Sequence, residues 1–343
     1  MRTLTRRELN RALLARQLLL APGELPLPAA LERVAGIQAQ YAPSMYVGLW
    51  SRLAGFDRAA LTAALERRDV VQGTLMRSTI HLVSRADYWP FALATRAARR
   101  ERWLRSVRDA PSAAAMAGAA RTLRRRLAQE GPLRRADIEQ LLGKTRAHGI
   151  GLWLDMVRVP PAGTWERRRA DVYAAAEDWI GPPEMTPRAA TQHLVRRYLE
   201  GFGPASAKDV ASFTGLTATA LKPALAALGL RRFGSEDGDE LLDVADGPLP
   251  GPETPAPPRF LPTWDATLLV HARRTGLLPE EHRPKLFSIK TPHSFPTFLV
   301  DGAVVGKWRH ERGRIELEPF GRLDAATRRA LDAEAERLAE FHA

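Results

Sequence analysis

The pattern of hydrophobic and polar positions predicts three helices followed by a two-stranded ribbon and a long helix within residues 1–110. Thr5 with Glu8 three residues later forms a capping box, and Asp57 is a second helix cap. Three helices and a ribbon in this order are typical of a winged helix. The expected helices cover residues 5–20, 28–40, 57–67 and 85–107, and the expected strands cover 70–76 and 78–83.

A weak internal repeat with an offset of 72 residues follows. Its first copy has Gly131-Pro132, Asp137-Ile138 and Gly143, and its second has Gly203-Pro204, Asp209-Val210 and Gly215. Each copy predicts a helix, a Gly-Pro turn, a short helix capped near the aspartate, and a third helix. Wing-like stretches follow at 158–169 and 230–244. We therefore predict three winged-helix units in tandem.

The last part of the chain has a different pattern. A proline-rich linker is expected at 247–258, and a hairpin with an Asp301-Gly302 turn joins strands at 297–300 and 303–309. A third strand at 314–320 and a helix from Asp324 complete a small antiparallel β element. The predicted fold class is mainly α with β wings (α+β). The predicted domains are 1–110, 111–182, 183–247 and 259–343.

The amino-acid composition limits the kinds of molecule that the protein is expected to bind. The net charge is +12, and only six of the 51 basic residues are lysines. Arginine forks onto phosphates and guanine edges, so a polyanion, nucleic acid first, is the expected partner. The absence of cysteine excludes disulfides, thiolate catalysis and iron–sulfur clusters. No apolar run is long enough to span a membrane, and the N-terminus lacks a signal-peptide pattern. A cytoplasmic protein is expected.

Two amide side chains, Gln38 and Gln40, flank Ala39 in the segment Gly36–Tyr41. Neutral amides are poor general bases, but each offers a donor and an acceptor that can hold a water molecule. That suits a reaction whose leaving group is already activated. A solvated pair or cap at the end of a helix is the competing interpretation.

Four segments together resemble the bacterial tandem winged-helix DNA glycosylases, of the type that gives resistance to azinomycin B. They are residues 36–40, 76–83, 261–269 with 281–283 after it, and 300–308. The resemblance implies three winged helices and a β element in a C shape around a DNA channel. It also implies that Gln38 and Gln40 are the catalytic Gln–aliphatic–Gln motif, whereas a sister branch has Asp at the last position.

The activity implied is excision of alkylated purines, including bulky adducts and interstrand crosslinks. An N7-alkylated purine carries positive charge and leaves easily, so catalysis reduces to placing a water near C1′ and stabilising an oxocarbenium-like state. No lysine lies near the motif, so a monofunctional enzyme without lyase activity is expected. The expected partner is double-stranded DNA, bound by a monomer associated with the nucleoid, without a cofactor.

Further candidate site residues are less specific. Strand alternation places Arg77 and His81 on one face, as a polar wall or as structural hydrogen-bonding groups. Trp264 and Asp265 are candidates to line the cavity, although Asp265 is equally suited to a turn. Basic wing residues are candidate DNA contacts or simply solvated: Arg167, Arg168, Arg169, Arg231 and Arg232.

His271, His282 and His293 recur every eleven residues without the carboxylate pattern of a zinc site, so no metal is expected. A non-catalytic winged-helix DNA-binding protein, such as a regulator, is the alternative function. A recognition helix rich in Asn, Gln and Arg at base-reading positions would favour it, and none is evident. An RNA-acting or structural protein is a third possibility.

Overall fold

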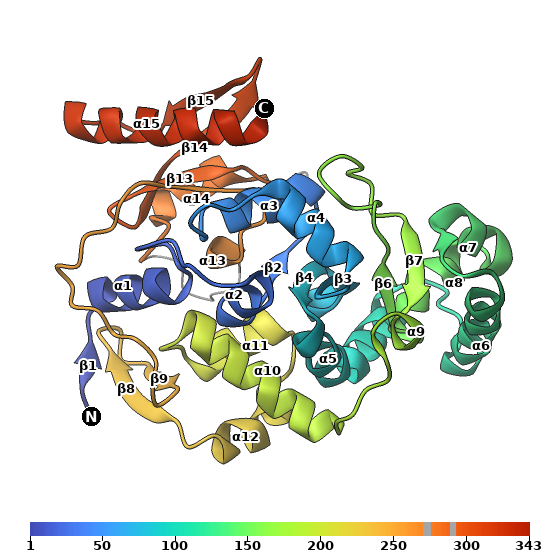
Figure 1. The fold of residues 1–343 in the computed structure, drawn as a ribbon. Helices are drawn as coiled ribbons and strands as arrows, with labels where there is room; N and C mark the ends of the chain where they lie inside the picture. Colours follow the sequence, from blue (N-terminus) through green and yellow to red (C-terminus); the bar gives the residue numbers. More distant parts are fainter. Residues whose placement is uncertain (270–275, 289–292) are drawn as a thin grey trace.

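The computed structural model describes residues 1–269, 276–288 and 293–343. Helices and short strands alternate along these segments in a mixed α/β fold (Figure 1). No helix in the described part of the chain is long and apolar enough to cross a membrane. The helices are α1 (Arg6–Arg16), α2 (Leu27–Arg33), α3 (Ala42–Trp50), α4 (Arg58–Glu66), α5 (Arg85–Ser106), α6 (Ala113–Glu130), α7 (Arg135–Leu142), α8 (Lys144–Gly149), α9 (Ala176–Ile180), α10 (Pro187–Phe202), α11 (Ala207–Thr214), α12 (Ala218–Ala227), α13 (Ala266–Leu269), α14 (Arg283–Leu286) and α15 (Ala325–His342).

One six-stranded sheet joins the first two predicted units. Its order is β2-β4-β3-β6-β7-β5, and every neighbouring pair is antiparallel. The predicted ribbon forms its second and third strands, β4 and β3, and β3 also pairs with β6 from the second unit. The strands are β2 (Ile37–Gln38), β3 (Val70–Thr74), β4 (Ile80–Ser84), β5 (Leu133–Arg134), β6 (Met156–Arg158) and β7 (Val172–Ala175). The number of winged-helix units and the boundaries at 110, 182 and 247 stay predictions.

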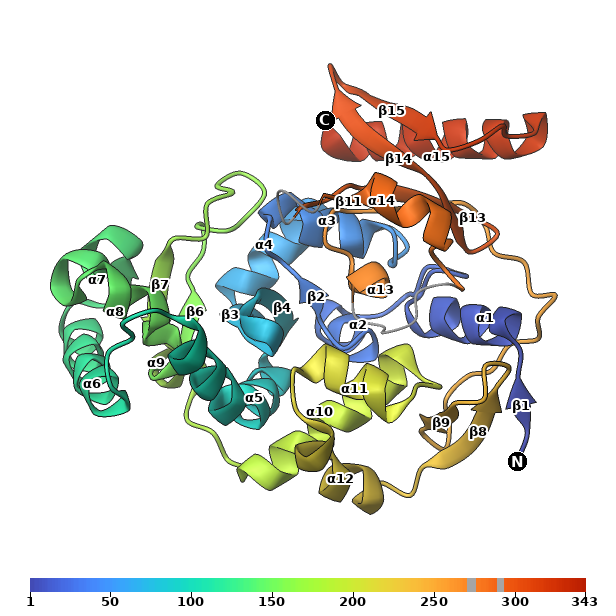
Figure 2. The same ribbon diagram turned by 180° about the vertical axis from the view of Figure 1, so that it is seen from behind.

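The repeat of 72 residues forms the predicted helices. In the first copy α6 ends at the Gly131 cap, and Asp137 lies in the first turn of α7. In the second copy α10 ends at the Gly203 cap, and Asp209 completes a capping box with Ser206 at the start of α11. A third helix, α8 or α12, follows in each. The long helix α10 lies alongside α5 and shares its core (Figure 2).

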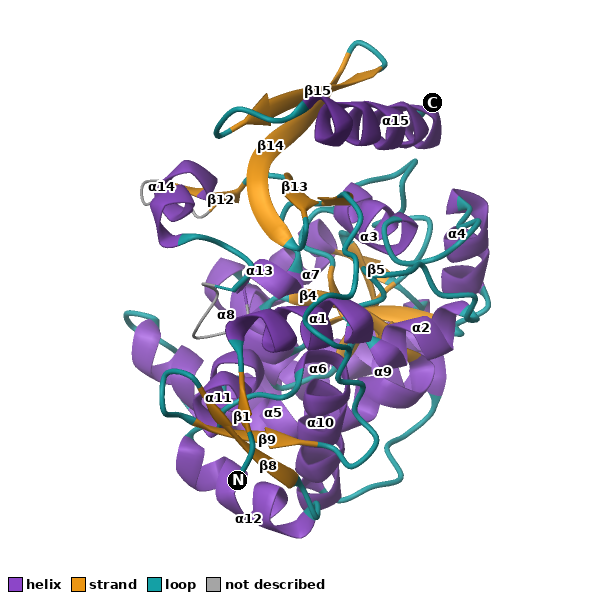
Figure 3. Cartoon of the chain, turned by 90° about the vertical axis from the view of Figure 1, so that its left-hand side faces the viewer, coloured by secondary structure: helices purple, strands orange, loops and turns teal. Residues whose placement is uncertain are grey.

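Three smaller sheets lie outside the six-stranded one in the described part of the chain. Near the N-terminus, β1 (Thr3–Leu4) pairs in parallel with β8 (Arg231–Ser235), which pairs with β9 (Glu240–Asp243). The predicted C-terminal hairpin is confirmed, since Asp301 and Gly302 connect β13 (Thr297–Val300) to β14 (Ala303–Glu311). Strand β15 (Arg314–Pro319) and helix α15, capped by Asp324, follow as expected. Helix α15 lies against β15 (Figure 3).

The C-terminal sheet has an additional edge strand, β10 (Arg259–Leu261), beside β13. A short antiparallel pair, β11 (Phe287–Ser288) and β12 (His293–Ser294), stands apart from it. Residues 247–258 contain neither helix nor strand, as predicted for a linker. The linker therefore connects β9 to a sheet whose strands all come from the last quarter of the chain.

The helix predicted over residues 28–40 is wrong. Helix α2 ends at Arg33, because Ala35 and Gly36 both adopt left-handed backbone, with φ of 60° and 79°. The chain reverses there and enters strand β2, which pairs with β4. Helix α3, absent from the prediction, then begins with Pro43 in its first turn. The glutamine pair thus lies on a short extended segment between two helices rather than at the end of one.

Candidate active site

Gln38 is held at the edge of the six-stranded sheet. It pairs with His81 of β4 across the strands, and its side chain is only 6% exposed. The pairing continues beyond β2, because the backbone N–H of Ala39 donates to the Ile80 carbonyl at 2.8 Å. Gln40 is exposed, and its side-chain oxygen accepts from the Ile80 backbone N–H at 3.2 Å. Strand β4 therefore fixes the backbone of the glutamine segment and the Gln40 amide.

The turn before Gln38 requires glycine. Gly36 has a φ of 79°, and a Cβ atom there would lie 2.9 Å from Cγ1 of Val83 and 3.2 Å from the Leu82 carbonyl oxygen. Real Cβ atoms essentially never approach other heavy atoms this closely. Because Gly36 has no Cβ atom, the turn can pack closely against β4, and this packing sets the position of the glutamine segment.

Arg77 fixes the orientation of the Gln38 amide. Arg77 and Ser78 have φ of 53° and 62°, in a tight turn between β3 and β4. The Arg77 guanidinium donates to the Gln38 side-chain oxygen at 3.2 Å and to the Phe213 carbonyl at 2.5 Å. Burial lowers the pKa of Arg77 to about 10, so the group stays charged near neutral pH. Because guanidinium groups only donate, the amide oxygen of Gln38 must face it.

His81 is a neutral histidine directly opposite Gln38. It is 2% exposed, and burial, with a contribution from the positive charge of Arg77, lowers its pKa to about 3. Its Nδ1 lies 3.1 Å from the Thr79 carbonyl oxygen. A carbonyl only accepts, so Nδ1 carries the proton and Nε2 is left as an acceptor. The structure therefore brings Gln38, Arg77 and His81 together, but Arg77 lies in the turn before β4 and not on the strand from which alternation placed it beside His81.

Asp265 is engaged in a buried ion pair. Both of its carboxylate oxygens lie 3.0 Å from the guanidinium of Arg52. One oxygen also accepts from the backbone N–H and the hydroxyl of Thr267, at 3.0 and 2.8 Å. Trp264, with a φ of 64°, donates its backbone N–H to the Ser294 hydroxyl at 2.7 Å. Asp265 thus serves as a turn acceptor and ion-pair partner.

The basic residues divide between two places. Arg168 lies on the loop between β6 and β7 and donates to the Tyr41 hydroxyl at 3.1 Å, one residue after Gln40. Its neighbours Arg167 and Arg169 pair with Asp171 at 3.7 and 3.3 Å. The loop therefore joins the glutamine segment through Tyr41, which the sequence analysis did not select.

Arg231 and Arg232 lie on β8, in a different sheet from Gln38. Arg231 pairs at 2.5 Å with Asp243, which also holds the buried Arg16, and Arg232 pairs at 2.5 Å with Glu240. The structure does not bring these two arginines together with the glutamine segment.

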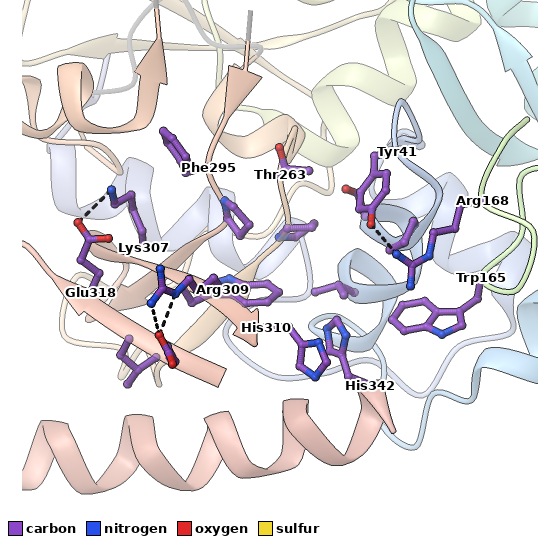
Figure 4. Close-up of a pocket in the computed structure, with 18 residues that line it drawn as sticks. Tyr41, Trp165, Arg168, Thr263, Phe295, Lys307, Arg309, His310, Glu318 and His342 are labelled. Carbon is purple, nitrogen blue, oxygen red and sulfur yellow. Dashed lines mark hydrogen bonds and ion pairs between the residues drawn. The ribbon is translucent and has the colours of Figure 1, made fainter. Parts of the chain in front are cut away.

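A cavity of about 620 Å³ begins at Tyr41 (Figure 4). The α3 helix, the β6–β7 loop, strands β14 and β15 and the end of α15 surround it. Aromatic and charged side chains dominate its wall. The side chains labelled in Figure 4 are Tyr41, Trp165, Arg168, Thr263, Phe295, Lys307, Arg309, His310, Glu318 and His342.

No group of three His, Cys, Asp or Glu side chains in the described ranges could hold a metal ion. Of the three evenly spaced histidines, His271 and the side chain of His293 lie outside the described residues. His282 is described, and its ring lies against Phe320 with the ring centroids 4.8 Å apart.

Comparisons with known proteins give one family and one similar fold. The model of the family described as "DNA glycosylase AlkZ-like" matches residues 31–341. Among solved structures, the DNA glycosylase AlkZ of Streptomyces sahachiroi is similar, with a TM-score of 0.78 and 17% sequence identity. The similarity covers 99% of this chain and 97% of that one. A search of curated proteins found no match.

Proposed function

Because the chain belongs to the AlkZ-like DNA glycosylase family, we propose that it hydrolyses the N-glycosidic bond of N7-alkylated purines in double-stranded DNA, bulky adducts and interstrand crosslinks included. Membership makes the chain a DNA-repair glycosylase and DNA its substrate. The choice of lesion and the absence of lyase activity are our proposals. The observation that carries the choice of lesion is the pair of uncharged amides, with Gln38 held by Arg77 and Gln40 held by the Ile80 backbone. The lack of a lysine near the pair in the sequence supports the absence of lyase activity.

The proposed reaction needs little from the protein beyond placement. A water oxygen forms a bond to C1′ as the C1′–N9 bond breaks, and the bonding electrons neutralise the positive charge of the alkylated ring. The water then loses a proton to solvent. An N7-alkylated purine is a good leaving group, so a strong general base or acid is unnecessary. An ordinary purine lacks that charge, so neutral amides would leave undamaged DNA intact.

The two amide oxygens are the groups that orient the water. Each already accepts one hydrogen bond, from Arg77 or from the Ile80 backbone, and a carbonyl oxygen has a second lone pair. The cation behind Gln38 prevents its amide from turning the NH₂ group inward. A water that donates to both oxygens has its own lone pairs free for C1′.

The remaining sequence predictions fit this proposal as follows. We propose that Arg77 and His81 support the amides from behind, and that Arg168 contacts DNA beside them. Three winged-helix units, a monomeric state and association with the nucleoid remain part of the proposal. The family match favours the enzyme over the non-catalytic regulator that the sequence left open.

The test is excision from duplex DNA that carries one N7-methylguanine or one nitrogen-mustard N7 crosslink. Wild-type protein should release the base and leave an intact abasic strand until it is heated in alkali. Gln38→Ala and Gln40→Ala should each lower the single-turnover rate by about 100-fold, the range for losing one oriented polar group. Both should still bind the DNA.

Two results would contradict the proposal. Strand cleavage without alkali would show lyase chemistry. Tight binding of both substrates without release of any base, by protein shown to be folded, would show that the lesion class is wrong.

A further inference from the structure

We propose that the cavity beside Tyr41 binds one unstacked nucleotide of the DNA substrate, with the base on the Tyr41 ring and the phosphate at Arg168. The proposal uses the proposed function only for the position of the lesion at Gln38 and Gln40. It adds a second binding site, next to the amides, for a nucleotide that is not itself cut.

The aromatic surface of the cavity is exposed. Six large hydrophobic side chains are exposed in the described part of the chain, and the two aromatic ones, Tyr41 (44%) and Phe295 (38%), both border this cavity. Figure 4 shows them on opposite sides of it. Nucleobases stack on exposed aromatic rings irrespective of sequence, because every base has a π face.

Arg168 supplies the positive charge. The other cations of the wall are neutralised, since Lys307 pairs with Glu318 at 3.0 Å and Arg309 pairs with Glu311 at 3.1 Å and with Glu316. Arg168 has no carboxylate partner among the described residues, and its hydrogen bond to the Tyr41 hydroxyl uses one of five N–H donors. An exposed guanidinium held against a tyrosine edge suits a phosphate beside a stacked base.

Two histidine rings form the end of the cavity near α15. The rings of His310 and His342 stack with their centroids 4.3 Å apart. Burial, with the nearby His310 and two arginines, lowers the pKa of His342 to about 4, so it is neutral near pH 7. Its Nε2 has no hydrogen-bond partner among the described residues. The neutral ring of His342 can pair with the edge of a base and brings no positive charge for a second phosphate.

Position and size agree with a single nucleotide. The volume of about 620 Å³ lies within the range of small-ligand sites. Tyr41 directly follows Gln40 in the chain, so the cavity begins one residue from the amide pair, although neither glutamine lines it. A nucleotide taken out of the stack beside the lesion would expose the C1′ atom of the lesion to water.

The experiment is a titration of the full-length protein with dGMP, deoxyguanosine and inorganic phosphate, followed by tryptophan fluorescence. Trp165 and Trp308 line the cavity and report its occupancy. We expect saturable quenching by dGMP. Tyr41→Leu should weaken dGMP binding by fivefold or more, the range for one stacking contact. Arg168→Met should weaken dGMP binding by about tenfold and leave deoxyguanosine binding unchanged.

The control is Arg329→Met, which removes an exposed arginine of α15 outside the cavity wall and should leave dGMP binding unchanged. Three results would overturn the proposal: no saturable quenching at millimolar dGMP, equal dGMP affinity in Arg168→Met, or inorganic phosphate binding as tightly as dGMP. The last would mean a simple anion site.

A second measurement connects the site to DNA. 2-Aminopurine placed next to the lesion brightens when it leaves the stack, and binding of wild-type protein should brighten it more than binding of Tyr41→Leu. An equal signal would overturn the proposal. The Gln38→Ala protein should bind dGMP like wild type, so failure of excision and failure of nucleotide binding are separate results.

Discussion

Gln38 and Gln40 lie two residues apart but have different surroundings. Gln38 is buried and its oxygen faces a charged guanidinium, whereas Gln40 is exposed and its oxygen faces a backbone N–H. Removing the Gln38 amide leaves the half-buried Arg77 with one hydrogen bond fewer, and water can replace the Gln40 amide. Loss of activity in Gln38→Ala must therefore be compared with the stability of that protein.

Arg77 allows the role of amide orientation to be separated from DNA binding. Arg77→Met removes the donor to Gln38 and keeps much of the side chain's volume. We expect single-turnover excision to fall by about 10- to 100-fold, because the amide can then rotate. The affinity for DNA should change by less than about threefold. Arg77→Lys should recover part of the rate. A large loss of DNA affinity with an unchanged rate would instead make Arg77 a phosphate contact.

His81 predicts a pH dependence of stability. Its pKa is about 3 in the folded protein and near 6.5 in the unfolded chain, so only the unfolded chain takes up the proton between those values. The contribution of His81 is complete above pH 6.5 and is lost as the pH falls toward 3, by about 1.4 kcal/mol per pH unit. Urea unfolding of wild type and His81→Asn at pH 7, 6 and 5 tests this. The stability difference between them should shrink as the pH falls, and a constant difference would contradict it.

At the scale of elements, the turn at Gly36 connects backbone geometry to the active segment. Gly36→Ala adds a Cβ atom 2.9 Å from Val83 at a positive φ. We expect the free energy of unfolding to fall by about 2 to 3 kcal/mol and excision to fall with it. Gly55→Ala is the matched control, because Gly55 also has a positive φ but nothing within 4 Å of its added Cβ. Gly55→Ala should lower the free energy of unfolding by only about 1 kcal/mol. If urea unfolding gave equal losses of stability for the two variants, the contact of the added Cβ atom with Val83 would not explain the effect of Gly36→Ala.

Local signals in the sequence were sufficient for several elements. The capping box at Thr5, the repeated Gly-Pro turns and the Asp301-Gly302 hairpin all form as predicted, since neighbouring residues determine them. The prediction of a helix over residues 28–40 was wrong because Ala35 adopts a left-handed backbone conformation, which the hydrophobic pattern does not reveal. Strand β2 has two residues and exists only through its pairing with β4, more than forty residues later. The sequence therefore identified the glutamine pair but not the extended backbone of the segment that carries it.

Contacts between distant parts of the chain decide the rest of the site. Arg52 and Asp265 form a buried pair across 213 residues, and Arg168 meets Tyr41 across 127. Nothing in the sequence relates these positions, so the sequence analysis could not assign Asp265 to a partner or select Tyr41. The Arg52–Asp265 pair also connects the N-terminal half of the chain to its C-terminal part.

The buried pair gives a prediction for the whole molecule. Asp265→Asn leaves the Arg52 guanidinium buried without a counter-charge, and we expect the free energy of unfolding to fall by about 3 to 5 kcal/mol. The double variant Arg52→Met with Asp265→Leu should recover much of this loss. Glu240→Gln, which breaks the exposed pair with Arg232, should cost less than about 1 kcal/mol. Similar losses in all three, measured by urea unfolding, would show that burial of the pair is unimportant.

The core beneath strand β2 has a consequence for how the protein is made. Ile37 and Leu82 pack in one hydrophobic cluster with Phe298, Trp308 and Leu338. A ribosome adds about 5 to 20 residues per second, so about 15 to 60 s separate the synthesis of Gln38 from that of Leu338. During that time the apolar side of the glutamine segment lacks its cover. The nascent chain should therefore engage chaperones throughout its synthesis and acquire activity only after α15 has left the ribosome.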